Sequence, residues 1–453
     1  MKTVNPTTGK VIEEYELMDD VELDSIINKA AVAQNDWKEL SFDQRAEYLN
    51  RIADILRDRK EGLGELMATE MGKPLAQGVS EAEKCAWVCE YYAENAVSFL
   101  ENETIETDAS ISYVTYNPLG TVLAIMPWNF PFWQLFRFAA PALMAGNAAL
   151  LKHAPNVTGC ALEIEHIIHK AGIPKSVFRT VLADIEQTQA MITHSEIDAV
   201  TLTGSTRAGK AVAGQAGNVL KKTVLELGGS DPYLILKDAD LEKAAETCVT
   251  SRLINSGQSC IAAKRFIAVK DVYDDFLELV ISNMNEKMVG DPFEESTDIG
   301  PMARFDLRDQ LHEQVKKSIK NGAECLLGGE ISDSEGAFYP ATVLTDIKKG
   351  MPAYEEELFG PVASVLKAEN EEEAIAIAND TQFGLGAAVF SKDAARAEQI
   401  ASERLEAGCC FVNEYVKSDP RLPFGGIKKS GYGRELSHHG IKEFVNIKTV
   451  FIS

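Results

Sequence analysis

The chain has 453 residues, more than one ordinary hydrophobic core holds, and this length predicts two or three domains. The hydrophobic share of 45% and the charged share of 25% are typical of a globular protein. Asp and Glu number 69 against 45 Lys and Arg, so the net charge is −24 and the surface repels nucleic acids and anionic lipids. We therefore expect no nucleic-acid partner, and an anionic substrate needs a local basic site.

No segment predicts export, membrane insertion or a metal site. Residues 1–9 have no apolar stretch of signal-peptide length, and no run of about twenty apolar residues is present. We therefore expect a cytoplasmic protein with no membrane partner. The cysteines lack the paired spacing of zinc sites. They are scattered as Cys85, Cys89, Cys160, Cys248, Cys260, Cys325, Cys409 and Cys410.

Helical spacing of apolar residues dominates residues 20–100, which we interpret as mostly scaffold. After a weakly alternating strand at 109–117, strands and helices alternate, which predicts a parallel, doubly wound sheet. Ligands of such sheets bind beyond the carboxyl ends of the strands. The predicted elements are strands at 120–126, 148–152, 177–182 and 199–203, with helices through 139–145 and 210–215.

A second series of strands and helices begins after Gly228 and Gly229, where we place a domain boundary. Its predicted elements are strands at 233–236, 266–269 and 362–366, with a long helix near 307–320. The tail, residues 443–453, alternates enough to be a strand. Like 109–117, it reads as an exposed edge strand, and such strands invite pairing with another chain.

Residues 255–260 (NSGQSC) place Cys260 after a polar loop that contains a glycine. Small residues let the backbone approach a substrate, and the Cys260 N–H can then face a bound oxygen. A free thiol has a pKa of about 8.5, so it is mostly protonated at neutral pH unless its surroundings lower that value. The alternative is a buried, inert cysteine.

Asn129 and Glu226 are two further candidate catalytic residues. Asn129 lies in residues 127–131 (PWNFP), after a predicted strand, where its amide can donate to a developing oxyanion. A loop Asn that bonds its own backbone is the alternative. Glu226 lies among apolar residues and glycines (225–229, LELGG), and burial makes such a carboxyl a useful general base. The alternative is a salt-bridged structural Glu.

Residues 204–209 (GSTRAG) follow a predicted strand and open a helix, a context that suits a dinucleotide pyrophosphate. The segment lacks one glycine of the usual fingerprint, so an ordinary turn is the alternative. Lys152 ends its strand, where its charge can meet ribose or phosphate oxygens. A surface lysine that extends its head to water is the alternative.

Together these motifs resemble the aldehyde dehydrogenases over essentially the whole chain. Seven occur in the family's order: 127–131, Lys152, 204–209, 225–229, 257–260, 357–361 (ELFGP) and 423–426 (PFGG). Within the family, the chain looks most like the shorter bacterial succinate-semialdehyde dehydrogenases, on residues 128–143, 152–157, 228–232 and 417–421.

This resemblance implies an α/β fold of two doubly wound, Rossmann-like parallel-sheet domains with a small β oligomerisation element. The implied division is a dinucleotide-binding domain (1–105 and 119–225), a catalytic domain (226–435) and the oligomerisation element (106–118 and 436–453). A homodimer or homotetramer is expected.

The resemblance also implies a mechanism. The Cys260 thiolate would add to an aldehyde, and the Asn129 amide and the Cys260 N–H would hold the oxyanion. Hydride would leave for NAD or NADP, and Glu226 would activate the water that hydrolyses the Cys260 thioester. The family's cofactor contacts correspond to Trp128, Lys152, His153, Ala154, Pro155, Gly204, Ser205, Gly209, Leu227, Glu357 and Phe359.

Two departures from the family pattern affect specificity. Pro155 stands where relatives carry a Glu or Ser, so strict NAD use loses its support and use of both cofactors is expected. Arg137 stands where semialdehyde-type members bind a carboxylate, and Ser418 or Arg421 could complete that pocket. Trp133 is expected to contact the substrate as part of an apolar tunnel. A second Arg of some relatives is Ile254 here, which weakens that assignment, and a structural ion pair is the alternative for Arg137.

Rival functions remain open at this point. They are a dehydrogenase of other small aldehydes, a CoA-acylating transferase or thioester hydrolase that uses the same cysteine, and a non-catalytic descendant. The joint presence of Cys260, Glu226 and Asn129 argues against the last.

Overall fold

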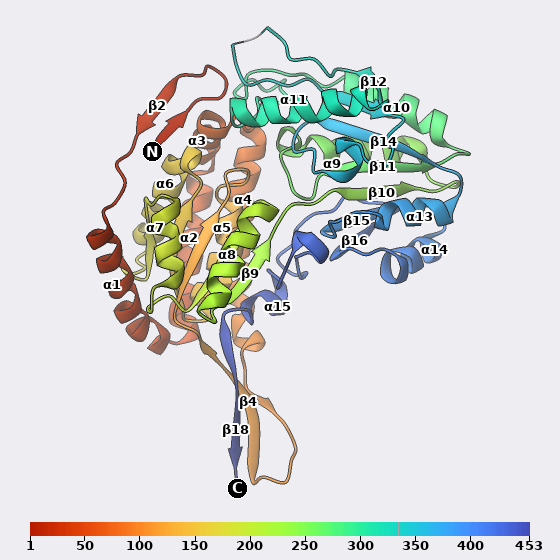
Figure 1. Cartoon of the computed structure of the whole chain (residues 1–453). Coiled ribbons are helices and arrows are strands. Elements are labelled where there is room, and N and C mark those ends of the chain that lie inside the picture. The colour runs from red at the N-terminus through yellow and green to blue at the C-terminus, as the bar shows by residue number, and fades with distance from the viewer. Residues whose placement is uncertain (334) are drawn as a thin grey trace.

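The computed structural model describes residues 1–333 and 335–453. Two α/β units, each a β-sheet with its helices, lie side by side, and a long β ribbon projects below the first of them (Figure 1). The N-terminal strands β1 (Lys2–Val4) and β2 (Val11–Glu14) form a small antiparallel pair. Four helices follow: α1 (Asp20–Glu39), α2 (Phe42–Asp58), α3 (Lys60–Met71) and α4 (Leu75–Phe99).

The first sheet has six strands in the order β17-β9-β8-β5-β6-β7. All pairs are parallel except β17 with β9. The bounds are β5 (Thr121–Met126), β6 (Ala148–His153), β7 (Phe178–Thr180), β8 (Ala199–Thr203), β9 (Lys222–Glu226) and β17 (Gly431–Tyr432). Its helices are α5 (Trp133–Met144), α6 (Thr158–Lys170), α7 (Ile185–Thr193) and α8 (Thr206–Asn218), with the short turn η1 (Pro155–Val157).

The strand order of this sheet reverses between β5 and β8. A crevice therefore opens beyond their carboxyl ends, where doubly wound sheets bind ligands. Trp128 and Asn129 follow β5, and Gly204 and Ser205 follow β8. The fold thus brings two of the predicted motifs to one edge.

The second sheet has seven strands in the order β12-β13-β14-β11-β10-β15-β16, and only β12 is antiparallel. The bounds are β10 (Asp231–Ile235), β11 (Ala263–Val269), β12 (Glu324–Leu327), β13 (Thr342–Thr345), β14 (Val362–Ala368), β15 (Gly386–Phe390) and β16 (Cys409–Val412). The helical elements after β9 are α9 (Leu241–Leu253), η2 (Ile254–Gly257), α10 (Tyr273–Asn285), α11 (Phe305–Lys320), α12 (Pro352–Glu355), α13 (Glu371–Asn379), α14 (Ala394–Gln399), η3 (Ile400–Arg404), η4 (Lys428–Ser430) and α15 (Ser437–Ile441).

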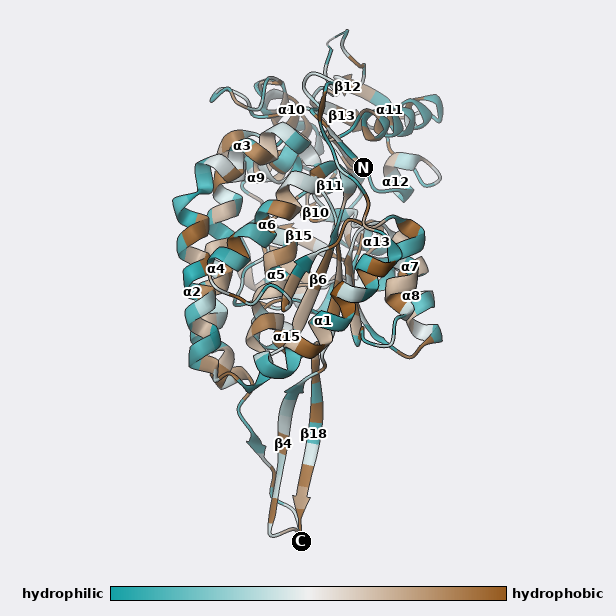
Figure 2. Ribbon diagram, turned by 90° about the vertical axis from the view of Figure 1, so that its left-hand side faces the viewer, coloured by the Kyte–Doolittle hydropathy of each residue, from teal (hydrophilic) through white to brown (hydrophobic). Residues whose placement is uncertain are grey.

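The projecting ribbon consists of β18 (Val445–Ile452), β4 (Ile111–Pro118) and β3 (Glu103–Thr104). β18 pairs with β4 antiparallel over its whole length, and the C-terminus lies at the tip. Figure 2 shows apolar residues on this arm far from the body of the molecule. Ile447 and Phe451 are 61% and 53% exposed.

The predicted α/β class with two doubly wound sheets is confirmed. The chain changes sheet between β9 and β10, at the Gly228–Gly229 pair where the sequence places a boundary. The proposed limits of the three domains stay a prediction. β17, within the range assigned to the catalytic domain, pairs with β9 of the first sheet.

One predicted helix was placed too late. α5 begins at Trp133 rather than near 139, and all twelve of its residues are buried. A helix without a polar face lacks the periodicity that marks its start. Its N-terminus is instead fixed by Glu81, whose Oε1 accepts hydrogen bonds from the N–H groups of Phe132 and Trp133, both at 2.9 Å.

The eight cysteines are all free thiols. Within residues 1–333 and 335–453, no helix is both long and apolar enough to span a membrane.

Candidate active site

Two large cavities meet at Cys260. One, of about 490 Å³, lies at the crevice of the first sheet, and its lining includes Trp128, Gly204, Leu227 and Phe359. The other, of about 730 Å³, lies between α4, α5 and the segment 415–424. Cys260 and Gln134 line both. The thiol therefore stands where a group bound in one cavity meets a group bound in the other.

The loop before Cys260 has an unusual backbone. Asn255, Ser256 and Gly257 have φ angles of 54°, 55° and 76°, in the left-handed region that is uncommon for residues with a side chain. A Cβ on Gly257 would lie 2.3 Å from the carbonyl of Gly360. Only glycine permits this approach, which fixes the Cys260 loop against the segment that carries Glu357 and Phe359.

Lys264 holds the same loop from behind. Its Nζ donates to the carbonyls of Ser259 (2.9 Å) and Cys260 (2.8 Å). It also lies 3.6 Å from Glu357, which accepts the N–H of Gly229 at 3.0 Å. Lys264 is buried, so this network is shielded from solvent. It joins the loop of Cys260, the predicted domain boundary and the Glu357 segment in one set of contacts.

Asn129 follows β5 and faces the loop of Cys260. Its Nδ2 donates to the carbonyl of Gln258 at 3.1 Å, and the amide of Asn255 donates to the Asn129 carbonyl at 2.7 Å. An amide nitrogen has two hydrogens, so Asn129 retains one. The N–H of Cys260 has no acceptor among the described residues. Two donors are thus free beside the thiol.

Burial raises the pKa of the Cys260 thiol to about 12, while the charges of Arg137 and Lys264 act in the opposite direction. The resting thiol is therefore protonated at neutral pH. Nucleophilic use requires that its proton be taken by a base as the bond to carbon forms.

Glu226 is a buried carboxyl at the end of β9. Burial first and the neighbouring Glu435 second raise its pKa well above the ordinary value. Neither oxygen has a hydrogen-bond partner among the described residues. A Cβ on Gly425 would lie 2.6 Å from one of them, so the glycine of the 423–426 motif leaves room for this side chain. Glu226 does not line either cavity. To act on a group bound at Cys260, its side chain must rotate toward the cavity or act through a bridging water.

Arg137 forms a buried ion pair with Glu435 and lies over the ring of Phe424, 4.6 Å from its centroid. This is the structural pairing considered as the alternative for Arg137. The guanidinium nevertheless lines the larger cavity, and its Nη2 has no hydrogen-bond partner in the described residues.

The predicted cofactor contacts divide into two groups. Trp128, Gly204, Ser205, Leu227, Glu357 and Phe359 line the first cavity, together with Arg207, Lys210 and Lys429. Trp128 and Phe359 meet edge to face, with ring centroids 5.7 Å apart. Gly209 lies behind, where a Cβ would lie 2.6 Å from Leu227.

Lys152, His153, Ala154 and Pro155 do not line this cavity. The His153 ring is buried, with Nε2 3.0 Å from the Pro131 carbonyl and Nδ1 accepting the N–H of Ala154. Its ring therefore holds the backbone of its own turn. Burial lowers the pKa of Lys152.

The predicted substrate residues Arg137, Trp133, Ser418 and Arg421 all line the larger cavity, as does Ile254. Arg421 is already bonded, since Nε and Nη2 donate to the two oxygens of Asp419 at 2.9 and 2.6 Å. Lys84 of α4 also lines this cavity and donates to Ser418. No sequence motif predicts a role for Lys84 or Lys264, and the helical spacing of residues 20–100 indicates only scaffold around Lys84. The polar stripe Gln77, Ser80, Glu81 and Lys84 was the available signal.

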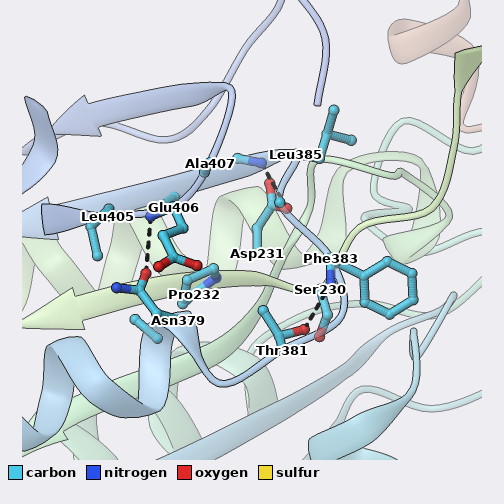
Figure 3. Close-up of a pocket in the computed structure, with 14 residues that line it drawn as sticks. Ser230, Asp231, Pro232, Asn379, Thr381, Phe383, Leu385, Leu405, Glu406 and Ala407 are labelled. Atoms are coloured by element: carbon cyan, nitrogen blue, oxygen red, sulfur yellow. Dashed lines mark hydrogen bonds between the residues drawn. The ribbon is translucent and has the colours of Figure 1, made fainter. Parts of the chain in front are cut away.

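A third cavity holds too little space for a substrate (Figure 3). Its volume of about 10 Å³ is roughly the minimum for one water molecule. Asp231 faces it, with one oxygen accepting the N–H of Gly386 at 3.1 Å, and burial raises the pKa of this carboxyl to about 7.

The comparisons with known proteins agree with this geometry. The aldehyde dehydrogenase family model matches residues 1–450, so the chain belongs to the aldehyde dehydrogenase family. It is 47% identical to a probable succinate-semialdehyde dehydrogenase [NADP(+)] of Synechocystis, over 100% of this chain and 99% of that protein. It is also 47% identical to the succinate semialdehyde dehydrogenase [NAD(P)+] of Escherichia coli, over 99% and 97% of the two chains.

Solved structures show the same fold. The structure described as "Structural insights into cofactor and substrate selection by Gox0499" superposes with a TM-score of 0.98 at 43% identity. The succinic semialdehyde dehydrogenase of Streptococcus pyogenes, in complex with NADP+, superposes with a TM-score of 0.97 at 36% identity. Both cover 100% of this chain and 99% of the other. The resemblance stated from the motifs is confirmed.

Proposed function

We propose that the protein oxidises a carboxylate-bearing aldehyde, succinate semialdehyde, to the acid through a thioester on Cys260, with NAD or NADP as hydride acceptor. The observation that carries the proposal is the place of Cys260 between the two cavities. Relatives at 47% identity over the full length carry names that include succinate semialdehyde and NADP.

In this proposal water carries the proton of the Cys260 thiol to solvent as the sulfur bonds to the aldehyde carbon. Asn129 and the Cys260 N–H, the two free donors, hold the oxyanion that forms. The dinucleotide, when bound, accepts the hydride. The oxyanion re-forms the carbon–oxygen double bond as the hydride leaves, and the product is a thioester on Cys260. Glu226 takes a proton from water, which attacks this thioester and releases the acid and the thiol.

The first cavity fits a dinucleotide. Ser205 caps α8 by accepting the N–H of Ala208, which leaves earlier N–H groups of the helix for an anion. Arg207, Lys210 and Lys429 add positive charge, which suits phosphates. Trp128, Leu227 and Phe359 offer apolar surface toward Cys260. Pro155 carries no charge that repels a ribose phosphate, and this supports use of both NAD and NADP.

A panel of aldehydes tests the substrate class. We expect kcat/KM for succinate semialdehyde to exceed that for butanal, an uncharged aldehyde of the same chain length, by at least about tenfold, because a charge-assisted hydrogen bond contributes roughly 1.5–3 kcal/mol. Measurement with NAD and with NADP gives the cofactor preference. Equal kcat/KM values for the two aldehydes would indicate the broader small-aldehyde dehydrogenase.

The same assays address the other class of function. A thioester hydrolase would release acid without a nicotinamide, and a transferase would form an acyl-CoA when CoA is added. Membership of the aldehyde dehydrogenase family favours neither.

We also propose that β18 joins subunits into a homodimer or homotetramer. The arm exposes apolar side chains that one subunit leaves uncovered, and its edge offers unpaired backbone groups. We expect deletion of residues 446–453 to reduce the mass measured by light scattering. The truncation keeps Phe444 and Val445, which are buried, so the fold should persist, as circular dichroism would check. A truncated protein that keeps the full-length mass would exclude this role of the tail.

A further inference from the structure

The larger cavity contains six charged side chains, and five of them already have a partner. Three of the five pair with a residue outside the cavity lining: Glu81 with Lys73, Arg137 with Glu435, and Lys417 with Glu414. The other two, Asp419 and Arg421, pair with each other. Each pair is neutral as a unit, so these side chains add little net charge to the cavity.

Lys84 is the exception. No carboxylate among residues 1–333 and 335–453 lies within ion-pair distance of its ammonium. The side chain is partly buried and lies over the ring of Trp133, with Nζ 4.2 Å from the centroid. A partly desolvated cation without an anionic partner is costly unless a ligand supplies one. The cavity therefore holds one uncompensated positive charge.

The ammonium also orients a neutral donor. Lys84 Nζ donates to Ser418 Oγ at 2.9 Å. Because the serine oxygen accepts this bond, the hydroxyl hydrogen points elsewhere and is free to donate. An ammonium and a hydroxyl side by side match the two oxygens of a carboxylate, and Cys260 lines the same cavity.

We infer that Lys84, with Ser418, binds the carboxylate of the substrate and determines the preference for a charged aldehyde. The inference rests on the proposed function. The resemblance described in the sequence analysis implies Arg137 for this role. Here Arg137 is paired with Glu435, whereas Lys84 has no carboxylate partner among the described residues.

The position of α4 supports this assignment. Gln77, Ser80, Glu81 and Lys84 recur at helical spacing on the face of α4 that lines the cavity. Glu81 on this stripe also caps α5, which carries Trp133 and Arg137. The distance between Lys84 and the α5 side chains is thus set by a direct contact between the two helices.

Lys84→Met tests the inference, because methionine keeps the apolar stem over Trp133 and removes the charge. We expect KM for succinate semialdehyde to rise about ten- to hundred-fold, while KM for butanal changes less than about threefold. Lys417→Met is the matched control, since this lysine lines the same cavity but is paired with Glu414, and it should leave both values nearly unchanged. Equal losses for both aldehydes, or no loss for either, would overturn the role of Lys84.

A second measurement uses the unmodified enzyme, so it does not depend on folding of a variant. Burial, aided by the charge of Arg137, lowers the pKa of Lys84 to about 8, against the opposing charges of Glu81 and Asp419. An ammonium loses its charge as pH rises through its pKa. The ratio of kcat/KM for succinate semialdehyde to that for butanal should therefore fall above about pH 8, and a ratio that stays constant to pH 10 would contradict the inference.

The two proposals fail in different ways. If the wild-type enzyme does not prefer the charged aldehyde, the proposed substrate class is wrong. If it does, and Lys84→Met keeps that preference, only the role of Lys84 is wrong.

Discussion

Cys260→Ala is expected to abolish aldehyde oxidation, with a loss of roughly 10⁴-fold or more, because the substitution removes the atom that adds to the carbonyl. Binding of NADP, followed by quenching of protein fluorescence, should remain within about threefold of wild type. The cofactor cavity keeps its other lining residues, and alanine fits where Cys260 stands. Cys410→Ala is a suitable control, since this thiol lies on β16 and lines neither large cavity. Substantial activity in Cys260→Ala would contradict the assignment.

Glu226→Gln is expected to separate hydride transfer from hydrolysis. Glutamine keeps the shape of the side chain but is not a base, so the first turnover should give one equivalent of reduced cofactor in a burst. Steady-state turnover should then fall by roughly 10²–10⁴-fold. Stopped-flow absorbance of the reduced cofactor distinguishes the phases. Normal steady-state turnover in Glu226→Gln would refute its role.

The pH profile of the wild-type enzyme provides a check on the same residue. Burial and Glu435 raise the pKa of Glu226 well above that of an ordinary carboxyl. A base acts only when deprotonated, so hydrolysis of the thioester should slow as pH falls through this raised pKa, at a higher pH than an exposed Glu would give. Arg137 opposes the shift, which makes its pair with Glu435 part of the electrostatics of Glu226.

The general fold follows from local pattern. β8 is buried along its whole length, and β5 and β14 are buried except for the half-buried Ile125 and the exposed Lys367. Their apolar runs are visible in the sequence. The chain changes sheet at Gly228–Gly229. Glycines are needed there because a Cβ on Gly228 would meet Glu357 and a Cβ on Gly229 would meet the Cys260 carbonyl. The start of α5 does not follow from pattern, because a fully buried helix has no polar face and its N-terminal cap comes from a residue of α4.

The candidate site was only partly predictable from the sequence. Asn129 and Cys260 belong to short motifs whose meaning does not depend on distant residues. The partners that decide charge lie far away in the chain: Arg137 meets Glu435, and Lys84 meets Ser418, 334 positions later. Whether a cation is neutralised depends on packing of such distant segments, which no local spacing reveals. Lys84, on a helix read as scaffold, acquires its place only when α4 packs beside α5.

The most direct test of the central claim is to find the acyl group on the enzyme. Glu226→Gln is mixed with succinate semialdehyde and NADP, quenched in acid after one turnover and digested, and its peptides are measured by mass spectrometry. The mechanism predicts one succinyl group on the peptide that contains Cys260, and none when NADP is left out. An unmodified Cys260 after a full burst of reduced cofactor, or acylation of another residue, would contradict it.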